Sequence, residues 1–334
     1  MDAPRVSVLL PARNAAVTLA ESIASIQRQT QSDWELLLWD DGSEDATPAI
    51  IDAYTSADRR IRLAGSGRVG ITEALRRLAE STKAALIGRM DGDDVSQPER
   101  FERQVALLRA NPAVGLCGTR VRIFGATARS GSRRYETWMN ALLTPEDHRR
   151  ERFIECPIAH PAFLMRREAY DAAGGYQESD APEDYDLLLR IVAAGWACAK
   201  TPEVLLDWRD SPRRLSRTDP RYAEGAFRAL KRRHLFKGVL PAGADWYQWG
   251  AGEVGKRWLR EWGSRAPAAV VDIRPGKLGQ TIHGIPVIPP EALPPPMTCG
   301  FILIAVGTPG ARNIIREWLV PRGYREDEQF LFIA

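Results

Sequence analysis

The stretch "LIGRMDGDDV", residues 86–95, places an apolar run directly before three aspartates, Asp91, Asp93 and Asp94. Clustered carboxylates repel one another and are poor strand formers, so we expect a buried strand that ends where the acids begin. A divalent cation would neutralise such a cluster, and carboxylate oxygens are the ligands that Mg²⁺ and Mn²⁺ prefer. The stretch therefore predicts a Mn²⁺ or Mg²⁺ site at the end of a strand.

Short apolar runs alternate with helix-like segments through the first third of the chain. This alternation predicts βαβ units, and hence an α/β fold with a mainly parallel central sheet flanked by helices. Ligands of such sheets bind beyond the carboxyl ends of the strands, where we place the aspartate cluster and a second acidic pair, Asp40 and Asp41. The expected strands are 5–12, 60–65, 85–90 and the start of 34–47; the expected helices are 15–30, 48–57, 70–84 and 98–112.

The middle of the chain is less regular. Residues 114–125 are strand-like, whereas residues 126–152 are polar and fit no element. Residues 181–196 predict a helix whose first turn contains Glu183 and Asp184. Acids in a first turn complement the helix dipole, so these two carboxylates are either dipole partners or chemical groups of a site.

Composition excludes several classes of protein. The chain has 334 residues, 44% of them hydrophobic, and a net charge of +3, which by itself does not indicate nucleic-acid binding. No apolar run approaches the roughly 18 residues of a membrane span, and the first apolar run is too short for a signal peptide. The four cysteines form no CxxC pair, as suits a reduced compartment. We expect a cytoplasmic protein, with peripheral contact at the inner face of the membrane left open.

Three other interpretations of the acidic cluster remain to be weighed. The first is a solvated acidic turn, the usual meaning of an isolated DxD. The second is a Mg²⁺-dependent phosphatase with Asp91 as nucleophile, although the GDxxxD pair that such an enzyme needs is absent. An EF-hand is excluded, because Ser96 stands where the loop requires glycine and Pro98 interrupts it.

Several motifs occur together in a fixed order: "PARN" near residue 12, "DDGSEDAT" at 40–47, "RMDGDD" at 89–94, "QPERFERQ" at 97–104 and "PEDYDLLLR" at 182–190. In this respect residues 4–210 resemble the family 2 glycosyltransferases, which have the GT-A nucleotide-sugar transferase fold. The resemblance implies inverting transfer of a sugar from a nucleotide diphosphate, with a UDP-sugar favoured, to a saccharide or lipid-linked acceptor. It also implies a role in bacterial cell-surface polysaccharide synthesis and no nucleic-acid partner.

The resemblance assigns a role to individual residues of this chain. Asp184 would be the catalytic base, with Glu183 beside it, and the DxD acids would hold the cation on the diphosphate. The remaining assignments are a nucleotide-sugar pocket of Pro11, Arg13, Asn14, Asp40, Asp41, Asp91 and Asp93, a metal set of Asp91, Asp93 and Asp94, and an acceptor or diphosphate set of His160, Arg209 and Ser216. A lone histidine such as His160 is more often a packed structural residue.

A second α/β unit follows in the last third of the chain. The motif "WGAGEVG" at 249–255 has the GxGxxG spacing of a phosphate-binding turn, with Gly250, Gly252 and Gly255, and Asp272 ends the next expected strand. Expected strands lie at 268–273, 300–308 and 329–334, and the proline-rich residues 285–296 are expected to form a loop. The region resembles small Rossmann-like nucleotide-binding domains at the front of some sugar acetyltransferases.

The function of this second unit is open on sequence alone. Its glycines either receive a nucleotide or only allow a strand and a helix to pack closely. In the first case, a nucleotide-sensing binding protein is an alternative function for the whole chain. We expect a glycosyltransferase domain at 1–212, a basic helical linker at 213–243 and a Rossmann-like domain at 244–334. The linker's basic residues would either pack on a domain or attract an anionic membrane.

Overall fold

The computed structural model describes residues 5–125, 130–212, 214–240, 243 and 245–334, which form two compact units. The first unit contains residues 1–148 and 156–219, and the second contains 149–155 and 220–334. Helix α10 (Glu224–Gly238), which we expected in a separate linker, falls within the second unit. The expected domain starts at 213 and 244 lie outside the described residues.

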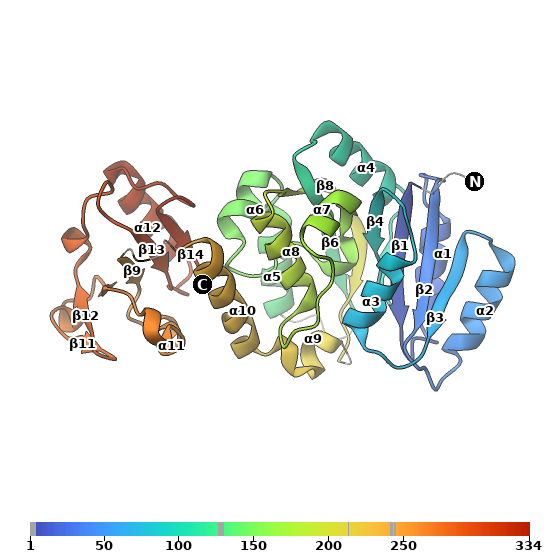
Figure 1. Cartoon of the computed structure of the whole chain (residues 1–334), viewed down its shortest axis with the longest axis horizontal. Coiled ribbons are helices and arrows are strands. Elements are labelled where there is room, and N and C mark those ends of the chain that lie inside the picture. The colour runs from blue at the N-terminus through green and yellow to red at the C-terminus, as the bar shows by residue number, and fades with distance from the viewer. Residues whose placement is uncertain (1–4, 126–129, 213, 241–242, 244) are drawn as a thin grey trace. The chain divides into compact units, whose positions relative to one another are not determined.

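A mixed eight-stranded sheet forms the centre of the first unit (Figure 1), in the order β3-β2-β1-β4-β7-β6-β8-β5. Strands β3, β2, β1 and β4 are parallel, as are β6 and β8, whereas β7 and β5 run antiparallel to their neighbours. The predicted α/β fold with a mainly parallel sheet is confirmed. The strands are β1 Val6–Ala12, β2 Trp34–Asp40, β3 Ile61–Ser66, β4 Leu86–Arg89, β5 Val95–Ser96, β6 Val114–Phe124, β7 Leu164–Arg166 and β8 Ala197–Arg209.

Nine helices precede residue 220 in the described part of the chain. Each of the four expected before residue 113 is present, although α1 is shorter than predicted because residues 15–18 form a turn. Their bounds are α1 Leu19–Gln27, α2 Thr47–Ala57, α3 Ile71–Glu80, α4 Arg100–Ala110, α5 Ser130–Ala141, α6 Pro145–Glu151, α7 Arg167–Ala172, α8 Glu183–Ala193 and α9 Leu215–Thr218.

Strand register explains how distant acids come to share one edge of the sheet. β1 lies between β2 and β4, pairing Ala12 with Asp40 and Leu9 with Arg89. All three strands are almost fully buried, as is typical of parallel strands covered on both faces. Their carboxyl ends therefore open at the same edge, which places Asp40 and the aspartate cluster on either side of the end of β1.

The longest strand, β8, was not expected from the sequence. Its 13 residues include Pro202 and Glu203, which weaken the strand pattern. The structure accommodates them with a register shift: Thr201 pairs with Thr119, and the next pair is Val204 with Arg120. Two residues of β8 thus bulge out opposite an unbroken β6, and the ladder continues on either side.

The second unit contains a six-stranded sheet in the order β11-β12-β10-β9-β13-β14. Omitting the short β11, the five parallel strands follow the chain order 3-2-1-4-5, which is the order of Rossmann sheets. This agrees with the expected Rossmann-like fold. Bounds are β9 Trp246–Trp249, β10 Ala269–Val271, β11 Thr281–Ile282, β12 Ile285–Ile288, β13 Phe301–Ile304, β14 Phe330–Phe332, α11 Glu253–Glu261 and α12 Ala311–Leu319.

The expectation of a loop over residues 285–296 is wrong at its start, where Ile285–Ile288 form β12. Ile285 and Val287 are buried while Pro286 is exposed, so the strand has the alternation of a half-buried ribbon. Val287 and Ile288 pair with β10, and proline occupies a position that the parallel ladder does not use. Prolines obscured a strand that tertiary pairing stabilises.

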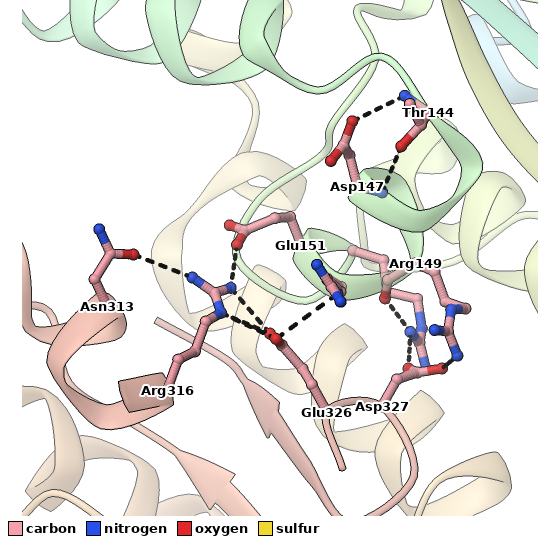
Figure 2. A network of polar contacts seen from close by, with 10 residues as sticks. Thr144, Asp147, Arg149, Glu151, Asn313, Arg316, Glu326 and Asp327 are labelled. Carbon is pink, nitrogen blue, oxygen red and sulfur yellow. Dashed lines mark hydrogen bonds and ion pairs between the residues drawn. The ribbon is translucent and has the colours of Figure 1, made fainter. Parts of the chain in front are cut away.

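A short segment far away in sequence completes the second unit (Figure 2). Glu151 accepts hydrogen bonds from Arg312 and Arg316, and Arg149 pairs with Asp327 at 2.7 Å. Lys231, which is buried, donates to the Ile154 carbonyl oxygen at 2.7 Å, and burial lowers its pKa to about 8. Residues 149–155 are therefore held by side chains from α10, α12 and the last loop.

Arg316 is the centre of this network, and its replacement should destabilise the second unit. It pairs with Glu151 at 2.7 Å and with Glu326, which is largely buried, at 2.9 Å. We expect Arg316→Ala to lower the free energy of unfolding by about 1–3 kcal/mol, because two carboxylates lose a donor. Arg325→Ala, which breaks an exposed pair with Glu328, is the matched control and should cost under about 0.5 kcal/mol. Equal losses in chemical denaturation would contradict the assignment.

Candidate functional site

The aspartate cluster forms as predicted, directly after β4. Carboxylate oxygens of Asp91, Asp93 and Asp94 all lie within 4.8 Å of one another. Helix α1 holds the loop from below, since Thr18 Oγ1 donates to the Gly92 carbonyl at 2.8 Å and Ser22 Oγ to the Asp91 carbonyl at 2.7 Å. The loop backbone is therefore fixed, and the three side chains converge.

The cluster's electrostatics fit a hard divalent cation. Burial and the charge of Asp91 raise the pKa of Asp93 to about 6, and burial together with both neighbouring charges raises the pKa of Asp94 well above its usual value. Asp94 is 1% exposed; its Oδ1 accepts from the Arg209 N–H at 2.7 Å, while its Oδ2 has no hydrogen-bond partner among the described residues. A cation would satisfy that orphaned oxygen and relieve the repulsion.

Arginines surround the acids, and the sequence pointed to only some of them. Arg89, buried at the end of β4, forms an ion pair with Asp91. Arg209 donates to the Asp93 carbonyl at 2.6 Å and pairs with Glu21, so it braces the acidic loop. Arg214, which we had not singled out, lies over the Trp208 ring and its charge lowers the pKa of both Asp93 and Asp94. The only sequence signal for Arg214 was the basic pair in "SPRRLS".

The predicted nucleotide-binding residues lie at the same edge but differ in their freedom. Asp41 Oδ1 accepts from the N–H groups of Val69 and Gly70 at 2.6 and 2.8 Å, which fixes the carboxylate in place. Asp40 accepts from the Ser43 N–H at 3.1 Å. Both carboxylates are nearly buried, so each keeps one oxygen for which neither bond accounts.

The first loop is held by the "SEDAT" side chains. Asn14, at a φ of 49°, donates its N–H to Ser43 Oγ and accepts from the Glu44 N–H at 2.9 Å. The next two N–H groups donate to Thr47 and Asp45. Asn14 thus joins two loops, whereas Pro11 is half-buried in β1 and Arg13 is exposed beside it.

Glu183 and Asp184 open α8 with different surroundings. Glu183 is 2% exposed and its Oε1 lies 3.7 Å from Nδ1 of His160. Asp184 is half-exposed, and its Oδ1 accepts from the Tyr185 N–H. A carboxylate that must reach a substrate needs exposure, so Asp184 rather than Glu183 is suited to proton transfer.

The structure places His160 in the interior rather than at an accessible surface. Its Nε2 shares a hydrogen bond with the Tyr176 hydroxyl at 2.8 Å, and its ring meets Phe163 edge-on. Burial, assisted by the charge of Arg89, lowers the pKa of His160 well below its usual value, so the ring is neutral. Ser216 is exposed on α9, which the structure does not connect to the cluster by any described hydrogen bond.

The glycine turn of the second unit is accounted for in large part by packing. Gly250 has a φ of 116°, and a Cβ at Gly255 would lie 1.8 Å from the Gly250 carbonyl oxygen. Asp272 Oδ2 accepts from the Ala251 N–H at 2.9 Å, and the carboxylate is paired with Arg274. Only Gly252 faces open space, since the nearest atom that a Cβ there would meet is Arg274 Nη2 at 3.7 Å.

Fold and site together define a class of protein. A mainly parallel sheet with acids at adjacent strand ends, and a carboxylate cluster suited to a divalent cation, is the arrangement of the GT-A glycosyltransferases. Residues 7–174, half of the chain, match the family model of "Glycosyl transferase family 2". The chain belongs to that family, as the sequence motifs indicated.

Relatives and solved structures agree with this membership. EpsE of Bacillus subtilis (strain 168), itself assigned to the glycosyltransferases provisionally, is 31% identical over 212 residues, 62% of this chain and 73% of EpsE. AmsE, an amylovoran biosynthesis glycosyltransferase of Erwinia amylovora, is 28% identical over 57% of this chain and 70% of its own.

Two solved structures share the fold. A mannosyltransferase from Pyrobaculum calidifontis, in complex with GDP-Man and Mn²⁺, aligns with a TM-score of 0.51 at 20% identity, over 70% of this chain and 63% of that one. S. aureus TarS 1–349 in complex with UDP-GlcNAc aligns with a TM-score of 0.56 at 13% identity, over 71% and 68%. At these identities the likeness establishes the fold alone.

Gly255→Ala should destabilise the second unit, because its Cβ would overlap the Gly250 carbonyl. We expect a loss of about 1–3 kcal/mol in the free energy of unfolding, as for other overpacked sites. Gly252→Ala is the matched control: its φ is −78° and no atom lies closer than 3.7 Å, so stability should change by under about 0.5 kcal/mol. Thermal unfolding of both variants tests this; equal stability would show that the turn is not closely packed.

The acidic cluster should make stability depend on pH and on Mn²⁺. The pKa of Asp93 is raised from 3.8 to about 6, so its stabilising contribution is present below pH 3.8 and is lost as the pH rises through about 6. A cation that replaces the proton reverses that loss. We expect Mn²⁺ to raise the Tm at about pH 7.5 and to have little effect below about pH 5.

Two variants serve as controls for that measurement. Asp93→Asn should abolish most of the Mn²⁺-dependent rise in Tm, whereas Asp52→Asn, at an exposed position of α2, should leave it intact. Undiminished stabilisation of Asp93→Asn by Mn²⁺ would exclude Asp93 as a ligand.

Proposed function

We propose that this chain is an inverting, divalent-metal-dependent glycosyltransferase that moves a sugar from a nucleoside-diphosphate sugar, with a UDP-sugar favoured, to an acceptor hydroxyl. The observation that carries the proposal is the convergence of three carboxylates at the end of β4, one of them with an orphaned buried oxygen. Solved structures of the same fold, with GDP-Man and Mn²⁺ or with UDP-GlcNAc, support this choice of donor and cofactor.

The donor half of the site is built from β1, β2 and β4. Asp91, Asp93 and Asp94 would hold Mn²⁺ or Mg²⁺, and the ion, when bound, stabilises the negative charge that develops on the leaving diphosphate. Asp40 and Asp41 are fixed by backbone N–H groups, so their remaining oxygens can accept from the hydroxyls of a ribose or the N–H groups of a base. Pro11, Arg13 and Asn14 would border the same pocket.

The acceptor half depends on α8. We assign Asp184 the role of general base, because it is half-exposed while Glu183 is buried. Asp184 would take the proton from the acceptor hydroxyl as that oxygen attacks the anomeric carbon from the face opposite the diphosphate. Attack and departure on opposite faces invert the configuration. Arg209, at the end of β8, and Ser216, on α9, would border the acceptor or the diphosphate.

The two rival functions have less support. A phosphatase would need Asp91 free as a nucleophile, whereas Asp91 is paired with Arg89. A nucleotide-sensing protein would need Asp272 to receive a ribose, whereas its carboxylate already binds Ala251 and Arg274. The second unit is therefore proposed as a packing module, with nucleotide binding at Gly252 as the remaining alternative.

We further propose that the reaction contributes to bacterial cell-surface polysaccharide on the cytoplasmic side of the membrane, with a saccharide or lipid-linked acceptor. Relatives named for amylovoran and O-antigen biosynthesis support this proposal. In the described part of the chain, no helix combines the length and apolarity needed to cross a bilayer. Membrane attraction by α10 has weaker support, because Arg228, Lys231 and Arg232 are engaged in contacts within the unit.

Separating donor binding from transfer tests the proposed function. Asp184→Asn should lower the transfer rate at least about 100-fold, because the acceptor loses its base, with Mn²⁺-dependent UDP binding unchanged. Asp91→Asn combined with Asp93→Asn should instead weaken that binding at least about 100-fold. Calorimetry measures binding, and a panel of nucleotide sugars screened by thermal stabilisation identifies the donor for the rate assay.

Asp180→Asn is the matched control for Asp184→Asn, because Asp180 is an exposed acid shortly before α8 and should tolerate the change. Full UDP binding by the double variant would show that the cluster is not the diphosphate site. Full transfer by Asp184→Asn would remove Asp184 from the mechanism.

A further inference from the structure

Arg89 is the one residue of the site whose chemistry the proposed function has not used. It ends β4 and is 1% exposed, beneath both the aspartate cluster and the start of α8. Its backbone is fixed on two sides: its N–H donates to the Phe163 carbonyl at 3.0 Å, and its own carbonyl accepts from Arg100 at 2.9 Å. Only the side chain of Arg89 can therefore change position.

The guanidinium serves two acids that belong to different halves of the site. It forms an ion pair with Asp91, and the charges of Asp91, Tyr176 and Glu183 all act on it. Glu183 is itself 2% exposed and lies beside His160, whose buried ring is neutral and supplies no countercharge. A buried carboxylate requires a nearby cation, and Arg89 is positioned to be one.

The hydrogen bonding of Arg89 is incomplete. Nε and Nη1 are buried and have no hydrogen-bond partner of good geometry among the described residues, although Nη1 belongs to the ion pair with Asp91. A guanidinium has five donors in a fixed fork, so this one retains donors for a second acceptor. Asp91, with its side chain 32% exposed, is by contrast the member of the pair that lies nearer to solvent.

From this arrangement, and on the basis of the proposed function, we propose that Arg89 is a positioning residue that couples cation binding at Asp91 to the placement of α8 and its base, Asp184. A divalent cation on Asp91 competes for the same carboxylate and repels the guanidinium. Arg89 then directs its donors to Glu183 at the first turn of α8. Loading of the donor site thereby orders the helix that carries the base on the acceptor side.

The proposal predicts a thermodynamic coupling between Glu183 and the cation site that passes through Arg89. With Glu183→Gln, Arg89 has only Asp91 as an acid partner, so Mn²⁺ should bind about threefold to tenfold more weakly. In an Arg89→Met background, the same Glu183→Gln change should alter Mn²⁺ affinity less than about 1.5-fold. Arg89→Met alone should tighten Mn²⁺ binding, because a competitor and a repelling charge are removed.

The experiment is a double-mutant cycle on the full chain, with Mn²⁺ alone as the probe and its binding followed by electron paramagnetic resonance. Equal effects of Glu183→Gln in both backgrounds would overturn the proposal while leaving the metal site intact. Absence of Mn²⁺ binding by the unaltered chain would instead contradict the proposed function itself, and the coupling with it.

A kinetic measurement separates positioning from a purely structural role. Arg89→Met should lower kcat about 100-fold and change the KM of the donor less than about threefold, with Arg89→Lys intermediate in kcat. A variant that loses only stability would recover full kcat below its Tm. Arg89→Lys keeps the charge but not the fork, so it serves for the cycle if Arg89→Met does not fold; the coupling should then fall by at least half.

Arg62→Met is the matched control, since it removes an arginine ion pair, with Glu35, from the same unit away from the cluster. It should change neither Mn²⁺ affinity nor kcat. A change in Mn²⁺ affinity equal to that of Arg89→Met would mean that general loss of positive charge, rather than the position of Arg89, determines the effect, and would overturn the proposal.

Discussion

Mutual repulsion of carboxylates at the end of β4 is the constraint on which the first unit depends. Three acids within 4.8 Å of one another, one of them almost fully buried, raise each other's pKa and cannot all be ionised without a compensating charge. Much of the surrounding structure answers that need. Arg89 pairs with Asp91 from below, and Arg209 gives its backbone N–H to Asp94 from β8.

This constraint also explains why the site lies on such rigid elements. Parallel strands fix the positions of Asp40 and the cluster relative to β1 to within one register. Thr18 and Ser22 hold the backbone of the acidic loop, and Gly70 and Val69 hold Asp41. A set of carboxylates held in this way loses little conformational freedom when it binds a cation, so the fold supplies preorganisation before any ligand arrives.

The two units solve the same topological problem with different degrees of commitment to a ligand. In the first, the polar groups at the strand ends keep unsatisfied oxygens, such as Oδ2 of Asp94. In the second, Asp272 binds its own loop and Gly255 accommodates the Gly250 carbonyl, so the glycine motif satisfies itself. Ion pairs fix the segment 149–155 within the second unit, which is therefore built from two separate stretches of the chain.

The sequence by itself determined the α/β class, the strands that precede residue 90, the acidic cluster and the family, because apolar runs and clustered acids are local signals. It did not predict β8, whose proline and polar residues obscure the strand, or β12, which begins "IPVI". Both strands depend on pairing with a partner distant in the chain.

Only the tertiary structure decided the roles of individual side chains. It placed Asn14 and the "SEDAT" side chains as links between loops, put His160 and Glu183 in the interior, and left Asp184 accessible. Arg89 was ambiguous between pairing with the acids and binding phosphate until the fold set it against Asp91. The reason is physical: burial and the distance between charges determine whether a polar group binds a ligand or its own protein, and neither quantity is encoded in a short stretch of residues.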